Sequence, residues 1–140
     1  MIRNMNPSDY NQILLPWFAG YDWSPVPVES LPKNCYIYEL EGKPRVFTCY
    51  YSSDSNIAII GYTIANPYLK VTEEELLNCL QYVLDEIKKA GFSYVHYSTG
   101  KGGIGIVRKL KKLGMSVTCG SGYIMGMSVR NNSIEFLQED

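Results

Sequence analysis

Three runs of β-branched and aromatic residues lie close together in the first half of the chain and restrict its fold more than any other feature. They cover residues 35–40, 46–51 and 57–65. The first two runs are separated by Glu41-Gly42-Lys43-Pro44, which is a hairpin signal, and the third is closed by Asn66-Pro67. The pattern predicts a three-stranded antiparallel meander.

A helix with clear signals at both ends follows the meander. Thr72 and Glu75 form a capping box, and Gly91 is a natural C-terminal cap. Between them, apolar residues recur at helical spacing, namely Leu76, Leu77, Leu80, Val83, Leu84 and Ile87.

Strands and helices also alternate on both sides of this central part. Residues 1–5 predict a strand and residues 10–18 a helix, whereas the proline-rich stretch 20–33 predicts a loop or a broken short helix. The later elements are a strand at 94–98, a helix at 104–113, and strands at 116–119 and 123–129. The predicted fold is α+β with a mixed sheet, in the order β-α-β-β-β-α-β-α-β-β.

The length and composition set limits on organisation and location. At 140 residues the chain fits one domain over residues 1–130, followed by a polar, acidic tail at 131–140. The four cysteines are scattered and show no metal-ligand spacing, so we expect reduced thiols and no metal site. Because no signal peptide or membrane-length apolar run is visible, we expect a soluble, cytoplasmic protein that contacts no membrane.

Positive charge is concentrated in the second half of the chain, although the formal net charge is only −1. Residues 88–134 hold eight basic and no acidic side chains. Such a segment is a solvated face, a site for a phosphorylated ligand, or a nucleic-acid patch.

A glycine cluster, Gly100-Lys101-Gly102-Gly103-Ile104-Gly105, lies within this basic segment between a predicted strand and a predicted helix. Backbone N–H groups, a helix N-terminus and positive charge meet there, which favours an anion site. The sequence of this cluster also matches the dinucleotide-binding motif G-x-G-x-x-G. A dinucleotide fold would place an acidic residue about 20 positions on, and none occurs between Glu86 and Glu135.

The order of elements and two short motifs resemble the GNAT N-acetyltransferase superfamily. The run Arg108-Lys109-Leu110-Lys111-Lys112-Leu113-Gly114-Met115 is similar to the GNAT helix that ends in a KLGF-type turn. Ile64-Ala65-Asn66-Pro67 is similar to the exit of the central GNAT strand. Over about residues 1–130, including 17–23, the chain resembles small GNAT-like proteins of bacteriophages and prophages, which would place it in the host cytoplasm.

This resemblance implies a sheet that splays between its fourth and fifth strands. Acetyl-CoA would enter where these strands diverge, and an amine, carried by a small molecule or a protein, would arrive from the opposite side. The pantetheine would pair with the backbone of Tyr62 to Ala65, with Ile64 and Ala65 supplying the contacts. Ser98 and Thr99 lie where relatives often present a polar side chain to the coenzyme.

Two further groups of residues are candidates for ligand contacts. The residues that would bind coenzyme phosphate are Lys101, Gly102, Gly103, Gly105 and Arg108; the alternatives are a flexible connection and a polar helix face. The residues in the region that shapes the acceptor pocket of relatives are Trp17, Tyr21 and Trp23, and core packing explains a tryptophan there equally well.

The sequence also departs from the family pattern. The loop at 67–71 lacks the glycines that grip the coenzyme diphosphate, and the next helix opens with three glutamates that would repel it. Leu110 stands where relatives often have a proton-donating tyrosine. In the central strand Tyr62 is the only titratable side chain, and His96 in the next strand is either an acid or base or a structural histidine.

Two functions therefore remain open from sequence. The first is acyl transfer from acetyl-CoA to an amine, with Tyr62 or His96 moving the proton. The second is a GNAT-shaped protein without catalysis that binds a protein or nucleic-acid partner through its basic face and aromatic loop.

Overall fold

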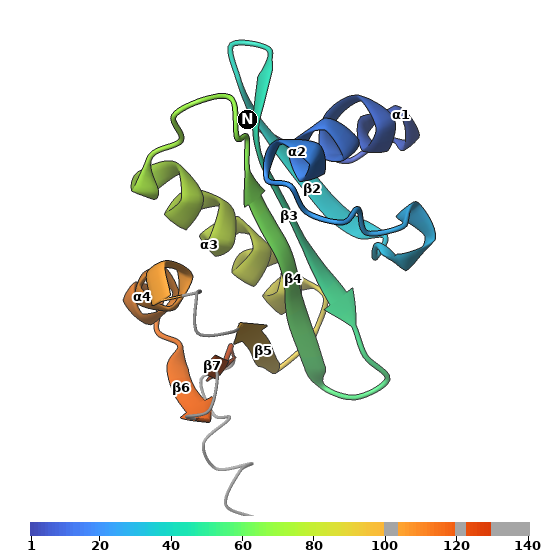
Figure 1. Ribbon diagram of the computed structural model, residues 1–140. Helices are drawn as coiled ribbons and strands as arrows, with labels where there is room; N and C mark the ends of the chain where they lie inside the picture. Colours follow the sequence, from blue (N-terminus) through green and yellow to red (C-terminus); the bar gives the residue numbers. More distant parts are fainter. Residues whose placement is uncertain (100–103, 120–122, 130–140) are drawn as a thin grey trace, which may run out of the picture.

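Seven strands form one sheet in the computed structural model, which describes residues 1–99, 104–119 and 123–129. Their order across the sheet is β1-β2-β3-β4-β5-β7-β6 (Figure 1). The β4–β5 pair is parallel and the other five neighbouring pairs are antiparallel. The strands are β1 Ile2–Asn4, β2 Asn34–Leu40, β3 Lys43–Ser52, β4 Ile57–Ala65, β5 Tyr94–Thr99, β6 Ser116–Cys119 and β7 Tyr123–Ser128.

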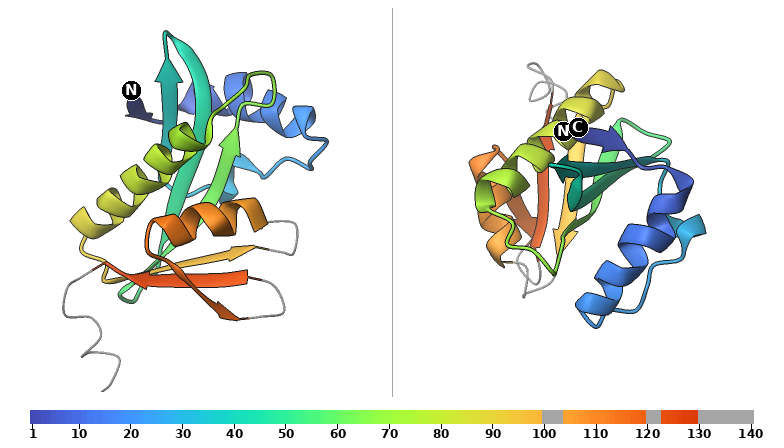
Figure 2. Two further views of the ribbon diagram at one scale, coloured as in Figure 1. Left: turned by 90° about the vertical axis from the view of Figure 1, so that its left-hand side faces the viewer. Right: turned by 90° about the horizontal axis from the view of Figure 1, so that it is seen from above.

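Helices cover both faces of the sheet (Figure 2). The first helical segment, which contains a π-helical stretch, lies on one face, and the two later helices lie on the other. The helical elements are α1 Pro7–Asp9, η1 Tyr10–Leu14, α2 Leu15–Gly20, η2 Val28–Ser30, α3 Glu73–Lys89 and α4 Ile104–Lys112. This element order confirms the predicted α+β arrangement, including the three-stranded meander.

The first helical segment begins earlier than predicted because residues before it cap it. The Asn6 backbone N–H donates to Asp9 Oδ2 at 2.7 Å, and Pro7 occupies the first helical turn. The Arg3 guanidinium in β1 donates to both oxygens of buried Asp9, at 2.7 and 3.0 Å. The helix therefore starts at Pro7 and not at Tyr10.

The hairpin between β2 and β3 is tighter than predicted. Only Glu41 and Gly42 form the turn, with φ of 54° and 77°, and both positive values fit the two-residue turns that match strand twist. Lys43 and Pro44 belong to β3. Pro44 lies opposite Glu39, at a register shift, where its missing N–H interrupts no regular ladder.

Two clusters of buried side chains stabilise the layers. The cluster beneath α3 and α4 contains Leu80, Val83, Leu84 and Ile87 of the predicted α3 stripe, together with Val107 and Leu110 of α4. The cluster beneath the first helical segment contains Leu14, Trp17, Phe18, Cys35, Ile37, Phe47, Cys49 and Ile64. Within the described ranges, no helix is long and apolar enough to cross a bilayer.

Candidate functional site

Strands β4 and β5 are paired only at their beginnings. Three parallel pairs join them, Ile57 with Tyr94, Ala58 with Val95 and Ile59 with His96. Beyond these pairs β4 continues to Ala65 and β5 to Thr99, and the two strands part (Figure 1). We call the side of residues 60–65 that faces away from β3 the unpaired edge of β4, since no described strand pairs with it.

The β3–β4 register determines which backbone groups face this edge. Asn66 N–H donates to the Arg45 carbonyl at 2.8 Å, and Ile64 lies opposite Phe47. Because bonded and non-bonded positions alternate in an antiparallel pair, the Ile64 amide and carbonyl face β3. The sequence prediction is therefore corrected for Ile64, and the backbone of Thr63 and Ala65 faces the unpaired edge instead.

A bulge lies in the middle of β4, beside this edge. Thr48 pairs with Thr63 but Tyr50 pairs with Ile60, so Gly61 and Tyr62 together oppose a single β3 residue. A Cβ on Gly61 would lie 2.6 Å from Cys49 Sγ. Packing therefore requires glycine here, and the bulge bends the strand where it leaves β5.

The two predicted acid–base candidates lie on one face of the sheet. Tyr62 is 43% exposed and lies two residues before Ile64, which packs beneath the first helical segment. Val95 packs against the opposite cluster, so the neighbouring His96 side chain faces the same side as Tyr62. His96 pairs with Ile59 of β4. Tyr62 comes three positions after Ile59, which corresponds to roughly 10 Å along the strand. The side chains share a face without being direct neighbours in the sheet.

The structure describes only some of the coenzyme-contact residues that were predicted at and after the end of β5. Ser98 alternates with Tyr97, lies on the face of His96 and is exposed. Thr99 is the last residue of β5. Lys101, Gly102 and Gly103 lie outside the described residues.

The N-terminus of α3 is occupied by side chains of the protein itself. Thr72 N–H donates to Glu75 Oε2 at 2.7 Å, and Glu75 N–H donates to Thr72 Oγ1 at 3.2 Å. Arg45 Nη2 donates to Glu75 Oε2 at 3.1 Å and to the Lys70 carbonyl at 2.8 Å. The hydrogen bond from Arg45, aided by that from Thr72, lowers the pKa of Glu75 to about 2. A carboxylate therefore occupies the helix end that would otherwise suit a diphosphate.

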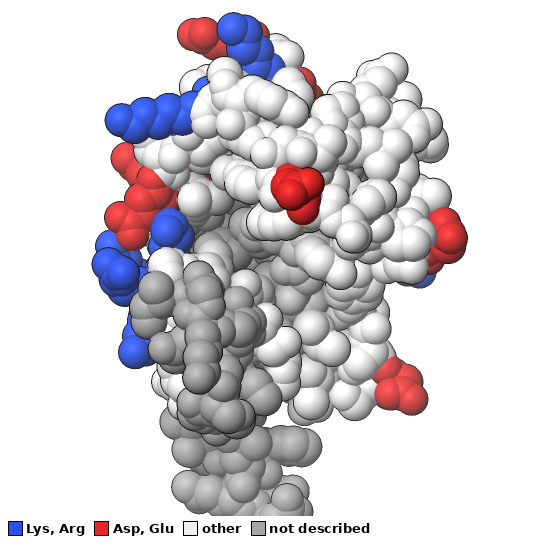
Figure 3. Space-filling view, in the orientation of Figure 1, with Lys and Arg blue, Asp and Glu red and all other residues white. Residues whose placement is uncertain are grey.

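Cations gather on α4, next to the acidic start of α3 (Figure 3). Lys112 Nζ lies 3.0 Å from Glu73 Oε1, and this contact lowers the pKa of Glu73. Lys109 Nζ donates to the Gly105 carbonyl at 3.4 Å in the first turn of α4. Arg108 is exposed. Of the predicted phosphate residues, the structure thus places Gly105 and Arg108 on one short helix.

The three aromatic residues predicted for the acceptor separate into two environments. Trp17 is only 3% exposed and packs in the core, so its prediction as a pocket residue is wrong and the packing alternative holds. The Tyr21 and Trp23 rings stack with centroids 4.4 Å apart, and Trp23 is 50% exposed. Tyr21 Oη donates to the Ala65 carbonyl at 2.7 Å. This bond joins the predicted acceptor region to the end of β4 and occupies that carbonyl.

Tyr68 belongs to the same surface and was missed from sequence. It is 66% exposed, and its hydroxyl donates to the Pro16 carbonyl at 3.2 Å. A Cβ on Gly20 would lie 2.7 Å from Pro67 Cγ, so glycine allows the loop after β4 to pack against the end of α2. The proline after β4 signals this loop, but its contact with α2 is visible only in three dimensions.

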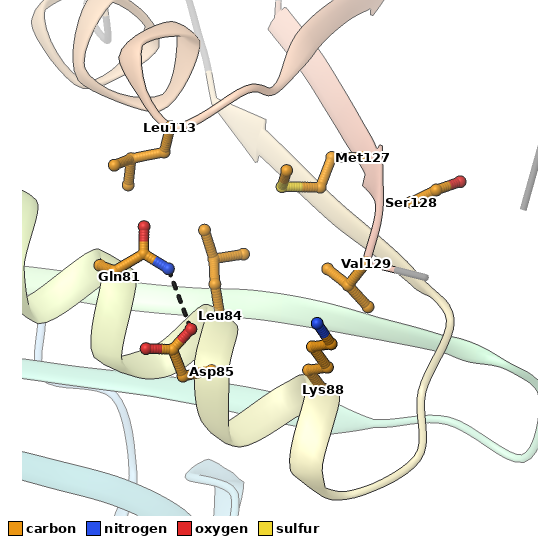
Figure 4. Close-up of a pocket in the computed structure, with 8 residues that line it drawn as sticks. All are labelled: Gln81, Leu84, Asp85, Lys88, Leu113, Met127, Ser128 and Val129. Atoms are coloured by element: carbon orange, nitrogen blue, oxygen red, sulfur yellow. Dashed lines mark hydrogen bonds between the residues drawn. The ribbon is translucent and has the colours of Figure 1, made fainter. Parts of the chain in front are cut away.

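A separate hollow of about 230 Å³ lies between α3 and the end of β7 (Figure 4). Its lining residues are Gln81, Leu84, Asp85, Lys88, Leu113, Met127, Ser128 and Val129. Gln81 Nε2 donates to Asp85 Oδ1 at 3.0 Å across its rim. None of the predicted site residues lines this hollow.

Solved structures share the whole arrangement. The ribosomal-protein-S18-alanine N-acetyltransferase of Escherichia coli aligns with a TM-score of 0.73 and 12% identity, over 92% of this chain and 93% of that one. A probable acetyltransferase of Staphylococcus epidermidis aligns with a TM-score of 0.75 and 12% identity, over 93% and 99%. The putative acetyltransferase yncA of Salmonella typhimurium, solved with its cofactor acetyl-CoA, gives 0.73 and 14%, over 94% of both chains.

The fold is that of the GNAT N-acetyltransferases. No family model and no curated protein matches the sequence. At these identities the likeness shows the GNAT fold alone, which the element order had predicted.

The end of α4 contains one of the departures from the family pattern, Leu110. Leu110, which the resemblance places where relatives often have a tyrosine, is fully buried in the cluster beneath α3 and α4. The helix turn after it forms as the motif predicted, since Met115 N–H donates to the Leu110 carbonyl at 3.1 Å and Gly114 has φ of 99°. The turn that the motif predicted is therefore present, and Leu110 is a core residue.

Proposed function

We propose that the protein transfers an acyl group from acetyl-CoA to a primary amine. The observation that carries this proposal is the parting of β4 from β5 at the Gly61–Tyr62 bulge, within a GNAT fold. It leaves the Thr63 backbone and the Ala65 N–H facing the unpaired edge, which suits an extended, amide-containing chain such as pantetheine. Bound acetyl-CoA would supply an activated thioester there.

The coenzyme phosphates would be held near α4 and not at α3. At α3, Glu75 already accepts from Thr72 and Arg45. At α4, Gly105 lies in the first turn and Arg108 is exposed. Lys101, which precedes this helix in the sequence, would also bind the phosphates. A helix start with adjacent cations favours phosphate.

The amine would approach over the face that carries Tyr62, His96, Tyr21 and Trp23. The stacked, half-exposed rings of Tyr21 and Trp23 offer an apolar surface next to the end of β4. Tyr62 or His96 would assist the movement of the proton that the amine loses on attack, while positioning alone supplies much of the rate. The structural neighbours include a ribosomal-protein-alanine N-acetyltransferase and an N-acetylglutamate synthase, which supports both protein and small-molecule amines as acceptors.

A second function is favoured by two observations. Glu75 occupies the N-terminus of α3, and a buried leucine, Leu110, stands where the resemblance implies a proton-donating tyrosine. Both fit a GNAT-shaped binding protein that has lost catalysis. Its partner would be a protein in preference to a nucleic acid, because Lys112 of the basic helix is already paired with Glu73.

The proposal is tested by thermal unfolding with acetyl-CoA, CoA and ADP. A ligand at 100 times its Kd adds ~2.7 kcal/mol to the free energy of unfolding. Arg108→Glu should weaken binding of all three ligands by roughly three- to tenfold, or ~0.7–1.4 kcal/mol. Lys33→Glu, a charge reversal at an exposed lysine before β2, is the matched control and should leave binding unchanged.

The outcomes separate the two functions. Stabilisation by acetyl-CoA followed by acetylation of a primary-amine panel, including a peptide with N-terminal alanine, supports transfer. Absence of stabilisation by all three ligands would replace the enzyme proposal with the partner-binding function.

A further inference from the structure

Two cysteines that are 14 positions apart in sequence face each other across neighbouring strands. Cys35 in β2 lies opposite Cys49 in β3, and both are free thiols. Both side chains pack in the cluster beneath the first helical segment, so they lie on the same face of the sheet. We propose that Cys35 and Cys49 form a thiol pair that a small oxidant closes into a reversible cross-strand disulfide.

The backbone geometry at this pair suits a disulfide. Met5 N–H donates to the Cys35 carbonyl at 2.8 Å, so the Cys35 backbone bonds to the β1 side and the Cys35–Cys49 pair is a non-hydrogen-bonded pair. The Cα atoms of such pairs are about 4.5 Å apart. That separation lies within the range of ~4.4–6.8 Å that disulfides span, so the bond requires no shift of the strands.

The surroundings give the two thiols different roles. Cys35 is 4% exposed and Cys49 is fully buried, so an oxidant reaches Cys35 first. Cys35 Sγ donates to the Pro32 carbonyl at 2.9 Å. The neighbouring Cys49 thiol lowers the pKa of Cys35, whereas the neighbouring Cys35 thiol and burial raise the pKa of Cys49. Cys35 is therefore the attacking sulfur and Cys49 the resolving one.

With hydrogen peroxide as the oxidant, the chemistry balances in two steps. The Cys35 thiolate attacks one peroxide oxygen, the O–O bond breaks, and the departing hydroxide takes up a proton to leave as water. The Cys49 sulfur then attacks the Cys35 sulfenic acid, the S–O bond breaks, and a second water leaves with the thiol proton. Two thiols and one peroxide thus give one disulfide and two waters.

The pair lies directly behind the bulge of β4. Cys49 Sγ donates to the Tyr62 carbonyl at 3.8 Å, and it is also the atom that a Cβ on Gly61 would meet. A bond to Cys35 removes the thiol proton of Cys49 and so abolishes its hydrogen bond to the bulge. Oxidation of the pair therefore alters the support of the strand that carries Tyr62, whether or not that strand serves acyl transfer.

The test treats the folded, full-length protein with hydrogen peroxide, blocks remaining thiols with an alkylating reagent, and maps the peptides by mass spectrometry. The expected result is one linked pair of peptides, containing Cys35 and Cys49, that has lost two hydrogen atoms and is restored by dithiothreitol. Cys35→Ser should abolish the link. Cys79→Ser, at another buried cysteine in α3, is the matched control and should leave it intact.

A measurement on the wild-type protein keeps the test independent of whether the variants fold. Oxidation in denaturant should give mixed pairings among the four cysteines, because register no longer brings two of them together. A folded sample in which Cys35 and Cys49 are alkylated or singly oxidised, without a bond between them, would overturn the proposal. So would a folded sample with the same mixture of pairings as the denatured one.

Discussion

The two tryptophans of the chain stand 6 positions apart and occupy opposite environments. Trp17 is 3% exposed, whereas Trp23 is 50% exposed. Trp17 lies on the buried side of α2, while Trp23 follows the helix and stacks on Tyr21. Only Trp23 is therefore available to an amine acceptor.

Fluorescence quenching distinguishes the two residues, since the chain has no other tryptophan. The emission of the Trp17→Phe protein reports Trp23 alone and should be quenched readily by acrylamide. The Trp23→Phe protein reports Trp17, so its emission should lie at shorter wavelength and resist quenching. Equal quenching of both variants would show that Trp17 is open to solvent, as its prediction for the acceptor pocket required.

At the scale of elements, the N-terminus of α3 is filled by the protein's own side chains, which leaves no room there for a bound anion. The Thr72–Glu75 capping box stabilises the helix by satisfying backbone donors. Arg45 then fixes the Glu75 carboxylate from β3. The same contacts that anchor α3 to the meander place negative charge at a helix start that would otherwise suit a diphosphate.

The low pKa of Glu75 predicts how stability depends on pH. A carboxyl group whose pKa is depressed on folding contributes stability that is complete above its unfolded value, near 4.5, and is lost as pH falls toward about 2. Glu75→Gln should reduce the loss of stability over this range, measured by urea unfolding at several pH values. Glu74→Gln, at the exposed neighbouring position, is the control and should show the wild-type dependence of stability on pH. The same pH dependence in the wild-type protein and both variants would contradict a lowered pKa at Glu75.

Much of this level of structure could be predicted from sequence, because its signals are local. The α3 cap, its apolar stripe and Gly114 after α4 follow from periodicity and turn chemistry. The β4 bulge and the Cys35–Cys49 pair could not be predicted, since both depend on register between strands. The burial of Trp17 likewise depends on which side of α2 faces the sheet.

At the scale of the whole molecule, the proposed acyl transfer depends on the separation of β4 from β5 in a sheet covered on both faces. Three parallel pairs hold the strands together at one end, and the bulge turns β4 away after them. Thr63 and Ala65 then face the unpaired edge. We propose that this edge holds the acyl donor.

Residue-resolved amide hydrogen exchange, measured by NMR with and without saturating acetyl-CoA, tests that claim most directly. A new hydrogen bond from a backbone amide contributes about 1 kcal/mol, so exchange at Thr63 or Ala65 should slow by about fivefold to tenfold. Ile64 is the internal control, because its amide already bonds to β3 and should change less. Saturation by acetyl-CoA with no slowing at Thr63 and Ala65 would contradict the account, even if protection appeared elsewhere.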